Sequence, residues 1–221
     1  MSSRVEVTYH TTQTVVAMNQ IFLLSPARCD GERARVLLNP DASFDLAERI
    51  RSRSGAPLGE VFSFLSGLYF RGKLSYAHAF GRHPRGSGAS FVITTDRGLT
   101  SPDVHVRRDD LLAFSEVDIA AGDERYLVPL RTHAERLAAE ISATTRIVLL
   151  GSIATGKYAD VLTQVFGERL LFPIEFVGRG DMSRGGLLLR CVAEQRELEY
   201  QAVLGAVRRG KRPPKLAPPR R

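Results

Sequence analysis

The residues best suited to chemistry are charged side chains in glycine-rich segments. Asp181 lies between Arg179 and Arg184, and four glycines accompany them from Gly178 to Gly186. A carboxylate in such a segment can act as an acid or base or stabilise a cationic sugar, while arginines bind phosphate. The alternative is a solvated turn whose charges pair with one another. We take Asp181 as the first catalytic candidate and Arg179 and Arg184 as candidates for substrate binding.

Three other aspartates, Asp30, Asp96 and Asp103, each follow a predicted strand. A water-activating carboxylate fits that position, although helix capping or turn formation explains any one of them more simply. Asp30 and Asp103 join Asp181 as catalytic candidates. The five histidines are scattered along the chain, so the sequence indicates neither a thiol–histidine pair with Cys29 nor a metal site.

The run from Gly151 to Tyr158 nearly matches the phosphate-binding pattern G-x-x-x-x-G-K-[ST]. It follows a predicted strand and precedes a predicted helix, as that motif requires. The last position holds Tyr158, whose phenol cannot replace the hydroxyl that ligates Mg²⁺. We therefore expect the amides of this loop, with Gly151, Ser152, Lys157 and Tyr158, to bind a phosphate or a base edge at a helix N-terminus.

A third polar segment begins at Ser66-Gly67. Tyr69 could stack on a base, and Arg71 and Lys73 could bind phosphates. The alternative places Tyr69 in the core and lets the cations extend their stems along the surface. With Ser25, in the turn after the first strand, these five residues complete the set of substrate-binding candidates.

The elements that position these residues follow from hydrophobic periodicity. Strands are expected at 21–24, 60–65, 91–95, 147–150 and 170–174, and helices at 32–38, 44–53, 68–80, 132–142 and 159–166; residues 104–130 are expected to be irregular. This alternation predicts a three-layer α/β/α fold with a mostly parallel central sheet. Ser66, Asp103, Ser152 and Asp181 would then be neighbours along one edge of that sheet.

Composition is that of a globular protein, with 43% hydrophobic and 25% charged residues in a chain of 221. We expect one domain at 1–206, of which 1–17 form an N-terminal arm, and a basic, proline-rich tail at 207–221. The tail holds seven cations and no acid, so the net charge of +7 leaves a neutral body. Such a tail contacts phosphates or keeps the protein soluble. Two distant cysteines and the absence of an apolar run of about 20 residues predict a cytoplasmic protein without a membrane partner.

The order of these motifs resembles a small family that shares the glycosylase-like α/β domain of archaeosine-type tRNA-guanine transglycosylases, distantly similar to the uracil-DNA glycosylase fold. The resemblance covers about residues 20 to 192 and depends most on Gly98-Leu99 followed by Pro102-Asp103, which matches the pattern G-L-x-x-P-D. The turn after the first strand and the loop after Leu150 also match. Val106 to Asp109 replace the family's Pro-Tyr-Asp turn, and the Asp-Pro-Tyr and His-Pro-Ser motifs of uracil glycosylases are missing.

The resemblance implies a uracil-DNA-glycosylase-like fold and a hydrolase that cleaves the N-glycosidic bond of a nucleobase in DNA, RNA or a nucleotide. The base would stack on Tyr69, a carboxylate would stabilise the sugar cation or activate water, and no metal or organic cofactor would be needed. The alternatives are a non-catalytic nucleic-acid or nucleotide-binding protein and, third, a phosphate-loop enzyme that uses Lys157.

Overall fold

The computed structural model describes residues 18–83, 88–119, 122–214 and 216. Its centre is a six-stranded sheet in the order β4-β3-β1-β6-β7-β8. Strands β1, β3, β6 and β7 are parallel, and β4 and β8 pair antiparallel at the two edges. The predicted α/β architecture with a mostly parallel sheet is confirmed. The strands are β1 (Gln20–Leu24), β3 (Ser90–Ile93), β4 (Leu99–Thr100), β6 (Arg146–Leu150), β7 (Leu170–Pro173) and β8 (Tyr200–Ala202).

The central strands are continuous apolar runs because helices cover both faces of the sheet. The side chains from Ile21 to Leu24 and from Ile147 to Leu150 are 0% exposed. Phe22 lies opposite Val148 of β6 on one side and Ser90 of β3 on the other. The middle of the sheet is therefore the rigid base from which the loops after β1 and β6 project.

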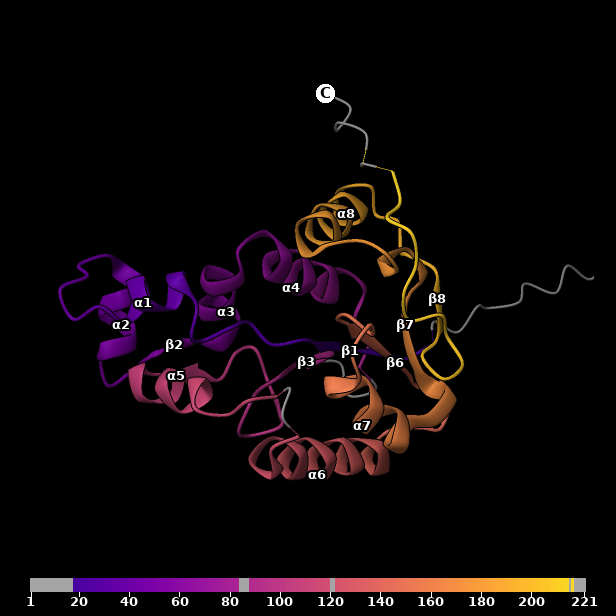
Figure 1. Ribbon diagram of the computed structural model, residues 1–221. Helices are drawn as coiled ribbons and strands as arrows, with labels where there is room; N and C mark the ends of the chain where they lie inside the picture. The colour runs from indigo at the N-terminus through magenta and orange to yellow at the C-terminus, as the bar shows by residue number, and fades with distance from the viewer. Residues whose placement is uncertain (1–17, 84–87, 120–121, 215, 217–221) are drawn as a thin grey trace, which may run out of the picture.

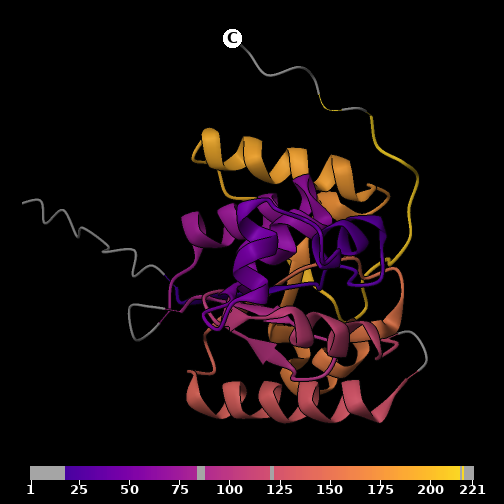
Figure 2. The same ribbon diagram turned by 90° about the vertical axis from the view of Figure 1, so that its left-hand side faces the viewer.

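Two pairs of helices form the outer layers (Figure 1). Helices α4 (Leu68–Phe80) and α8 (Asp181–Ala193) cover one face, and α6 (Glu124–Glu140) and α7 (Gly156–Phe166) cover the other. Figure 2 shows α8 and α6 on opposite sides of the sheet. Two short 3₁₀ turns, η1 (Gly167–Arg169) and η2 (Ile174–Phe176), flank β7.

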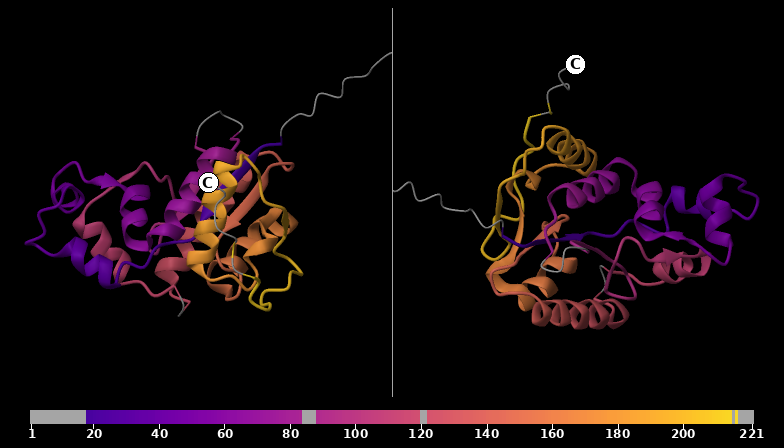
Figure 3. Two further views of the ribbon diagram at one scale, coloured as in Figure 1. Left: turned by 90° about the horizontal axis from the view of Figure 1, so that it is seen from above. Right: turned by 180° about the vertical axis from the view of Figure 1, so that it is seen from behind.

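A lobe of short elements lies beyond one end of the sheet, as the views from above and behind show (Figure 3). Phe62 of the lobe packs edge-on against Phe70 of α4, with ring centroids 5.4 Å apart, and thereby joins the lobe to the sheet layers. The lobe consists of α1 (Glu32–Leu38), α2 (Asp45–Arg51), β2 (Ala56–Pro57), α3 (Leu58–Ser66), β5 (His105–Val106) and α5 (Arg108–Ser115).

The order of the parallel strands creates a topological switch point between β1 and β6. The chain leaves β1 for β3 on one side and, after β6, moves to β7 on the other. Loops at the carboxyl ends of β1 and β6 therefore diverge and leave a crevice, which is where open α/β sheets bind ligands. Ser25 directly follows β1, and Gly151 directly follows β6.

Three predicted elements differ from the structure. Residues 60–65 belong to α3 and form no strand, because a short apolar run fits a buried helix as well as a strand. The segment 104–130 contains all of α5 and the start of α6, where we expected irregular chain. The glycine-rich segment around Asp181 is the first part of α8, so only Gly178 to Gly180 remain a loop.

Part of the predicted tail lies against the domain. Arg208 forms an ion pair of 2.7 Å with Asp160 of α7, and the Arg179 guanidinium donates to the carbonyl of Pro214 at 3.4 Å. The predicted N-terminal arm, residues 1–17, lies outside the described residues, as do Lys215 and residues 217–221. Among the helices of the described ranges, none combines the length and apolar character needed to cross a membrane.

Candidate active site

A cleft of about 510 Å³ lies at the carboxyl ends of β1 and β3 and beside the start of α7. Its volume is within the usual range of small-molecule sites. One wall is the loop after β1, and the opposite wall is the segment that leaves α5. The lining residues are Pro26, Ala27, Arg28, Cys29, Asp30, Thr95, Phe114, Ser115, Glu116, Val117, Asp118, Ile119 and Lys157.

Asp30 is the predicted catalytic carboxylate that the structure places in this cleft. Arg28 holds it through two hydrogen bonds, of 3.0 and 2.9 Å, between the guanidinium and the two carboxylate oxygens. These bonds keep the pKa of Asp30 below its ordinary value. The carboxylate is ionised at neutral pH and fits the role of stabilising positive charge or orienting a water molecule.

Lys157 supplies a cation to the same cleft. It is exposed, lies in the first turn of α7, and forms no ion pair with any described residue. An ammonium group next to a helix N-terminus is well placed to bind a phosphate. Lys157 is the one member of the predicted substrate-binding set that lines this cleft.

The far wall of the cleft is fixed by Thr95. Its hydroxyl donates to the carbonyl oxygen of Phe114 at 2.8 Å, at the last turn of α5. The Arg97 guanidinium lies over the Phe114 ring, 4.7 Å from its centroid. These contacts hold the segment Ser115 to Ile119 against the sheet edge, where it contributes both apolar surface and two acidic residues.

Cys29 also borders the cleft, but its thiol is a poor nucleophile. Burial and the nearby carboxylates raise its pKa from 9.0 to about 12. Its Sγ lies 3.8 Å from the carbonyl oxygen of Ala27. Because the thiolate is the reactive form, Cys29 stays unreactive at neutral pH.

Behind the cleft, Ser25 and Lys73 form a buried polar pair. The Lys73 ammonium donates to the Ser25 carbonyl oxygen at 2.6 Å and to its hydroxyl oxygen at 2.9 Å. Lys73 is 0% exposed, so the prediction that it binds a phosphate at the surface or extends into solvent is wrong. Burial lowers the pKa of Lys73 to about 7.

Tyr158 joins this pair from α7. Its hydroxyl oxygen accepts a hydrogen bond of 2.9 Å from the backbone N–H of Ser152. The phenol therefore occupies the inside of the loop where a phosphate loop would hold its ligand. Gly151 permits this packing, because a Cβ there would lie 2.9 Å from the Ser25 Cβ and 3.0 Å from the Tyr158 hydroxyl.

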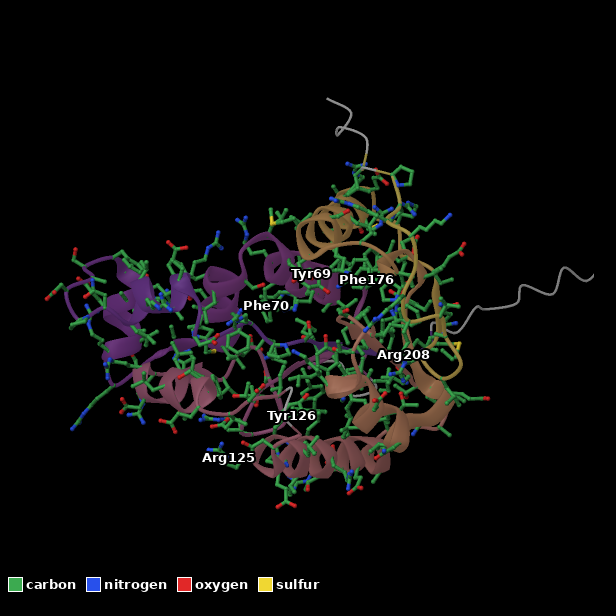
Figure 4. All side chains as sticks on the ribbon, viewed as in Figure 1. Tyr69, Phe70, Arg125, Tyr126, Phe176 and Arg208 are labelled. Atoms are coloured by element: carbon green, nitrogen blue, oxygen red, sulfur yellow. The ribbon has the colours of Figure 1, made fainter. Side chains whose placement is uncertain are left out.

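Tyr69 is part of the core and is not available to stack on a base. It is 5% exposed and packs edge-on against Phe176, with ring centroids 6.3 Å apart (Figure 4). The Lys73 ammonium lies 4.5 Å from the centroid of the same ring. The expected stacking role of Tyr69 is therefore wrong, and its core alternative is confirmed.

Asp181 and Arg184 lie one turn apart at the start of α8. Arg184 is buried and donates to the carbonyl oxygen of Phe176 at 3.0 Å and to Asp181 at 3.3 Å. Asp181 is exposed and does not line the cleft. Arg184 therefore ties α8 to η2, while Arg179 borders a separate hollow with Met182 and Pro214.

The other predicted residues lie away from the cleft. Gly67 and Arg71 border a shallow hollow with Arg33 on the lobe, and Ser66 is the last residue of α3. Asp103 is exposed beside the first turn of α3, where its neighbour Pro102 accepts a hydrogen bond from Gly59. The expected cluster of Ser66, Asp103, Ser152 and Asp181 does not line this cleft.

Sequence reasoning missed the far wall of the cleft, from Phe114 to Ile119. The signal was present, because Glu116 and Asp118 alternate with apolar Val117 and Ile119 directly after an amphipathic segment. The expectation that residues 104–130 are irregular gave this alternating segment no place in the predicted fold. Among the residues the structure describes, no three His, Cys, Asp or Glu side chains are grouped to hold a metal ion.

Comparisons with known proteins add no assignment: no family model, no curated protein and no solved structure matches the chain.

Proposed function

We propose that the protein is an N-glycosidase that binds a nucleobase-containing substrate in the cleft at the carboxyl ends of β1 and β3. The observation that carries this proposal is the placement of Asp30 and Lys157 in one cleft, at the carboxyl edge of a mostly parallel sheet. The parallel strands, taken in chain order, run 2-1-3-4 across the sheet, which is compatible with the uracil-DNA-glycosylase-like fold that the motif order resembles.

Glycosidic cleavage needs a negative charge near the sugar, because the transition state resembles an oxocarbenium ion. The ionised carboxylate of Asp30 meets this need and can also orient an attacking water. Lys157 and the N-terminus of α7 would bind a phosphate of the substrate. The apolar side chains of Val117 and Ile119, rather than Tyr69, would contact the base.

The phosphate-loop alternative has less support from the geometry. Tyr158 folds back into the loop and takes the Ser152 amide, which would otherwise face a phosphate. The non-catalytic binding alternative uses the same cleft and differs only in whether the base is released. An assay that measures binding and release together separates these two functions.

Base release from a panel of modified and unmodified oligonucleotides and nucleotides tests the proposal. The Asp30→Asn variant should lose about 10²-fold or more of the rate, the usual size of such a carboxylate's contribution. Asp103→Asn is the matched control, because Asp103 is exposed outside the cleft. Binding without release from any substrate would favour the non-catalytic protein, and full activity of Asp30→Asn would overturn the assigned role.

A further inference from the structure

We propose that Ser25 is a nucleophile with Lys73 as its general base, and that this pair catalyses acyl transfer from an ester or amide to water. This activity is separate from glycosidic cleavage and does not depend on it. Ser25 follows β1, is 6% exposed and does not itself line the cleft, whereas the next two residues, Pro26 and Ala27, do. The carbonyl group of an acyl substrate would approach Ser25 from this end of the cleft.

The geometry of Lys73 is that of a base held for one partner. Its Nζ lies 2.9 Å from the Ser25 hydroxyl oxygen, and the second bond, to the Ser25 carbonyl, fixes it in place. The rings of Tyr69 and Phe70 lie 4.5 and 4.6 Å from Nζ and exclude solvent from two sides. Among the described residues, Lys73 forms no ion pair with a carboxylate.

A lysine with only a structural role in a core is normally paired with an acid, because an isolated buried charge is costly. The charged groups that face Lys73 come from α8, where Asp181 favours the ammonium and Arg184 opposes it. Burial is the largest influence and lowers the Lys73 pKa to about 7. In a large fraction of the protein molecules Lys73 is therefore a neutral amine near pH 7, with a lone pair that can accept a proton.

The tyrosines beside the pair keep their protons. Burial raises the pKa of Tyr69 and of Tyr158, so neither becomes an anion near neutral pH. Tyr158 lies next to Ser25 because Gly151 has no side chain between them. A protonated phenol beside the nucleophile is a hydrogen-bond donor that can stabilise the oxygen anion formed from the substrate carbonyl.

The reaction balances with water as the only co-reactant. The Ser25 oxygen bonds to the substrate carbonyl carbon as its proton passes to the Lys73 amine. The bond from that carbon to the leaving nitrogen or oxygen then breaks, and the ammonium returns the proton to the leaving group. Water attacks the acyl-serine ester, gives its proton to Lys73 and restores Ser25, and a carboxylic acid is released.

A fluorophosphonate ester tests the nucleophile without knowledge of the substrate. The Ser25 oxygen should bond to phosphorus and displace fluoride, and peptide mass spectrometry should locate the added mass on Ser25. The labelling rate of the wild-type protein should rise with pH and reach half its maximum near the Lys73 pKa of about 7. In Lys73→Met the rate at Ser25 should fall by about 10²-fold or more.

Two variants provide matched controls. Ser115→Ala removes an exposed serine, and Lys211→Met removes an exposed lysine outside the cleft; neither should change labelling at Ser25. Thermal unfolding checks that Lys73→Met is folded. If this variant does not fold, the pH profile of labelling in the wild-type protein tests the proposal. Absence of label on Ser25, or a rate that does not change between pH 6 and 8, would overturn the proposal.

Discussion

Gly72 of α4 and Gly185 of α8 meet backbone to backbone: a Cβ added at Gly72 would lie 2.8 Å from the carbonyl oxygen of Gly185. A Cβ at Gly185 would in turn lie 2.7 Å from the carbonyl oxygen of Leu68. Neither oxygen can move without shifting its helix. Each glycine is adjacent in sequence to a buried cation, Lys73 after Gly72 and Arg184 before Gly185. The close approach of the two helices therefore removes both cations from water.

We therefore expect Gly185→Ala to destabilise the protein by about 1–3 kcal/mol, the usual effect of overpacking a core. Gly186→Ala is the matched control, because a Cβ there would meet only the Leu216 side chain at an ordinary 3.6 Å. In a helix interior that change should be neutral or stabilise by up to about 1 kcal/mol. Urea unfolding measures both free energies, and equal effects of the two substitutions would contradict the close packing.

The sheet was predictable because its central strands are unbroken apolar runs, Ile21 to Leu24 and Ile147 to Leu150, and each leads into a polar turn. The loops that follow Leu24 and Leu150 could be assigned to one edge of the sheet for the same reason. The helix at 68–80 was also predictable, with the bounds that the structure shows. The strand expected at 60–65 was wrong, because a short apolar run does not distinguish the two periods.

The environment of Lys73 could not be predicted from the sequence. The periodicity of its helix marks only one face as buried, and a lysine between Gly72 and Leu74 is usually a surface residue. Its burial results from the contact of α4 with α8, which is more than a hundred residues away along the chain. Local sequence patterns contain no information on such a contact. The burial of Lys73, which we expected to bind phosphate, could therefore not be predicted.

Stability should depend on pH through Lys73. The folded protein releases this proton near pH 7, whereas the unfolded chain keeps it up to the ordinary lysine pKa of 10.5. Between these values the unfolded state binds more protons, so the free energy of unfolding rises with pH, by about 1.4 kcal/mol per unit from this group. Below pH 7 both states are protonated, and the unfavourable burial of the charge persists.

Urea unfolding of the wild type and of Lys73→Met between pH 6 and 9.5 measures this dependence. The difference in stability between the two proteins should change with pH above 7 and stay constant below it. Taking the difference removes the contributions of the buried tyrosines and cysteines, which are the same in both proteins. A constant difference over the whole range would show that Lys73 keeps its ordinary pKa.

Cys29 should react slowly with alkylating reagents although it borders the cleft. With the pKa raised from 9.0 to about 12, the thiolate fraction at pH 8 falls by about 10³-fold. Iodoacetamide labelling of the native protein, compared with the protein in denaturant, measures this ratio by peptide mass spectrometry. Alkylation of native Cys29 at the denatured rate would mean that the thiol ionises readily and that thiol chemistry in the cleft must be considered again.

Two buried tyrosines should respond in opposite ways to loss of the hydroxyl group. Tyr158→Phe leaves the Ser152 amide without its acceptor, so we expect a loss of about 1–3 kcal/mol and faster hydrogen exchange at Ser152. The Tyr126 hydroxyl is buried and has no partner among the described residues, so Tyr126→Phe should be neutral or stabilising. Both changes remove one oxygen from a buried ring, and only the hydrogen bond differs. Equal stability of the two variants, with unchanged exchange at Ser152, would show that the Tyr158 hydroxyl does not accept the hydrogen bond from the Ser152 amide.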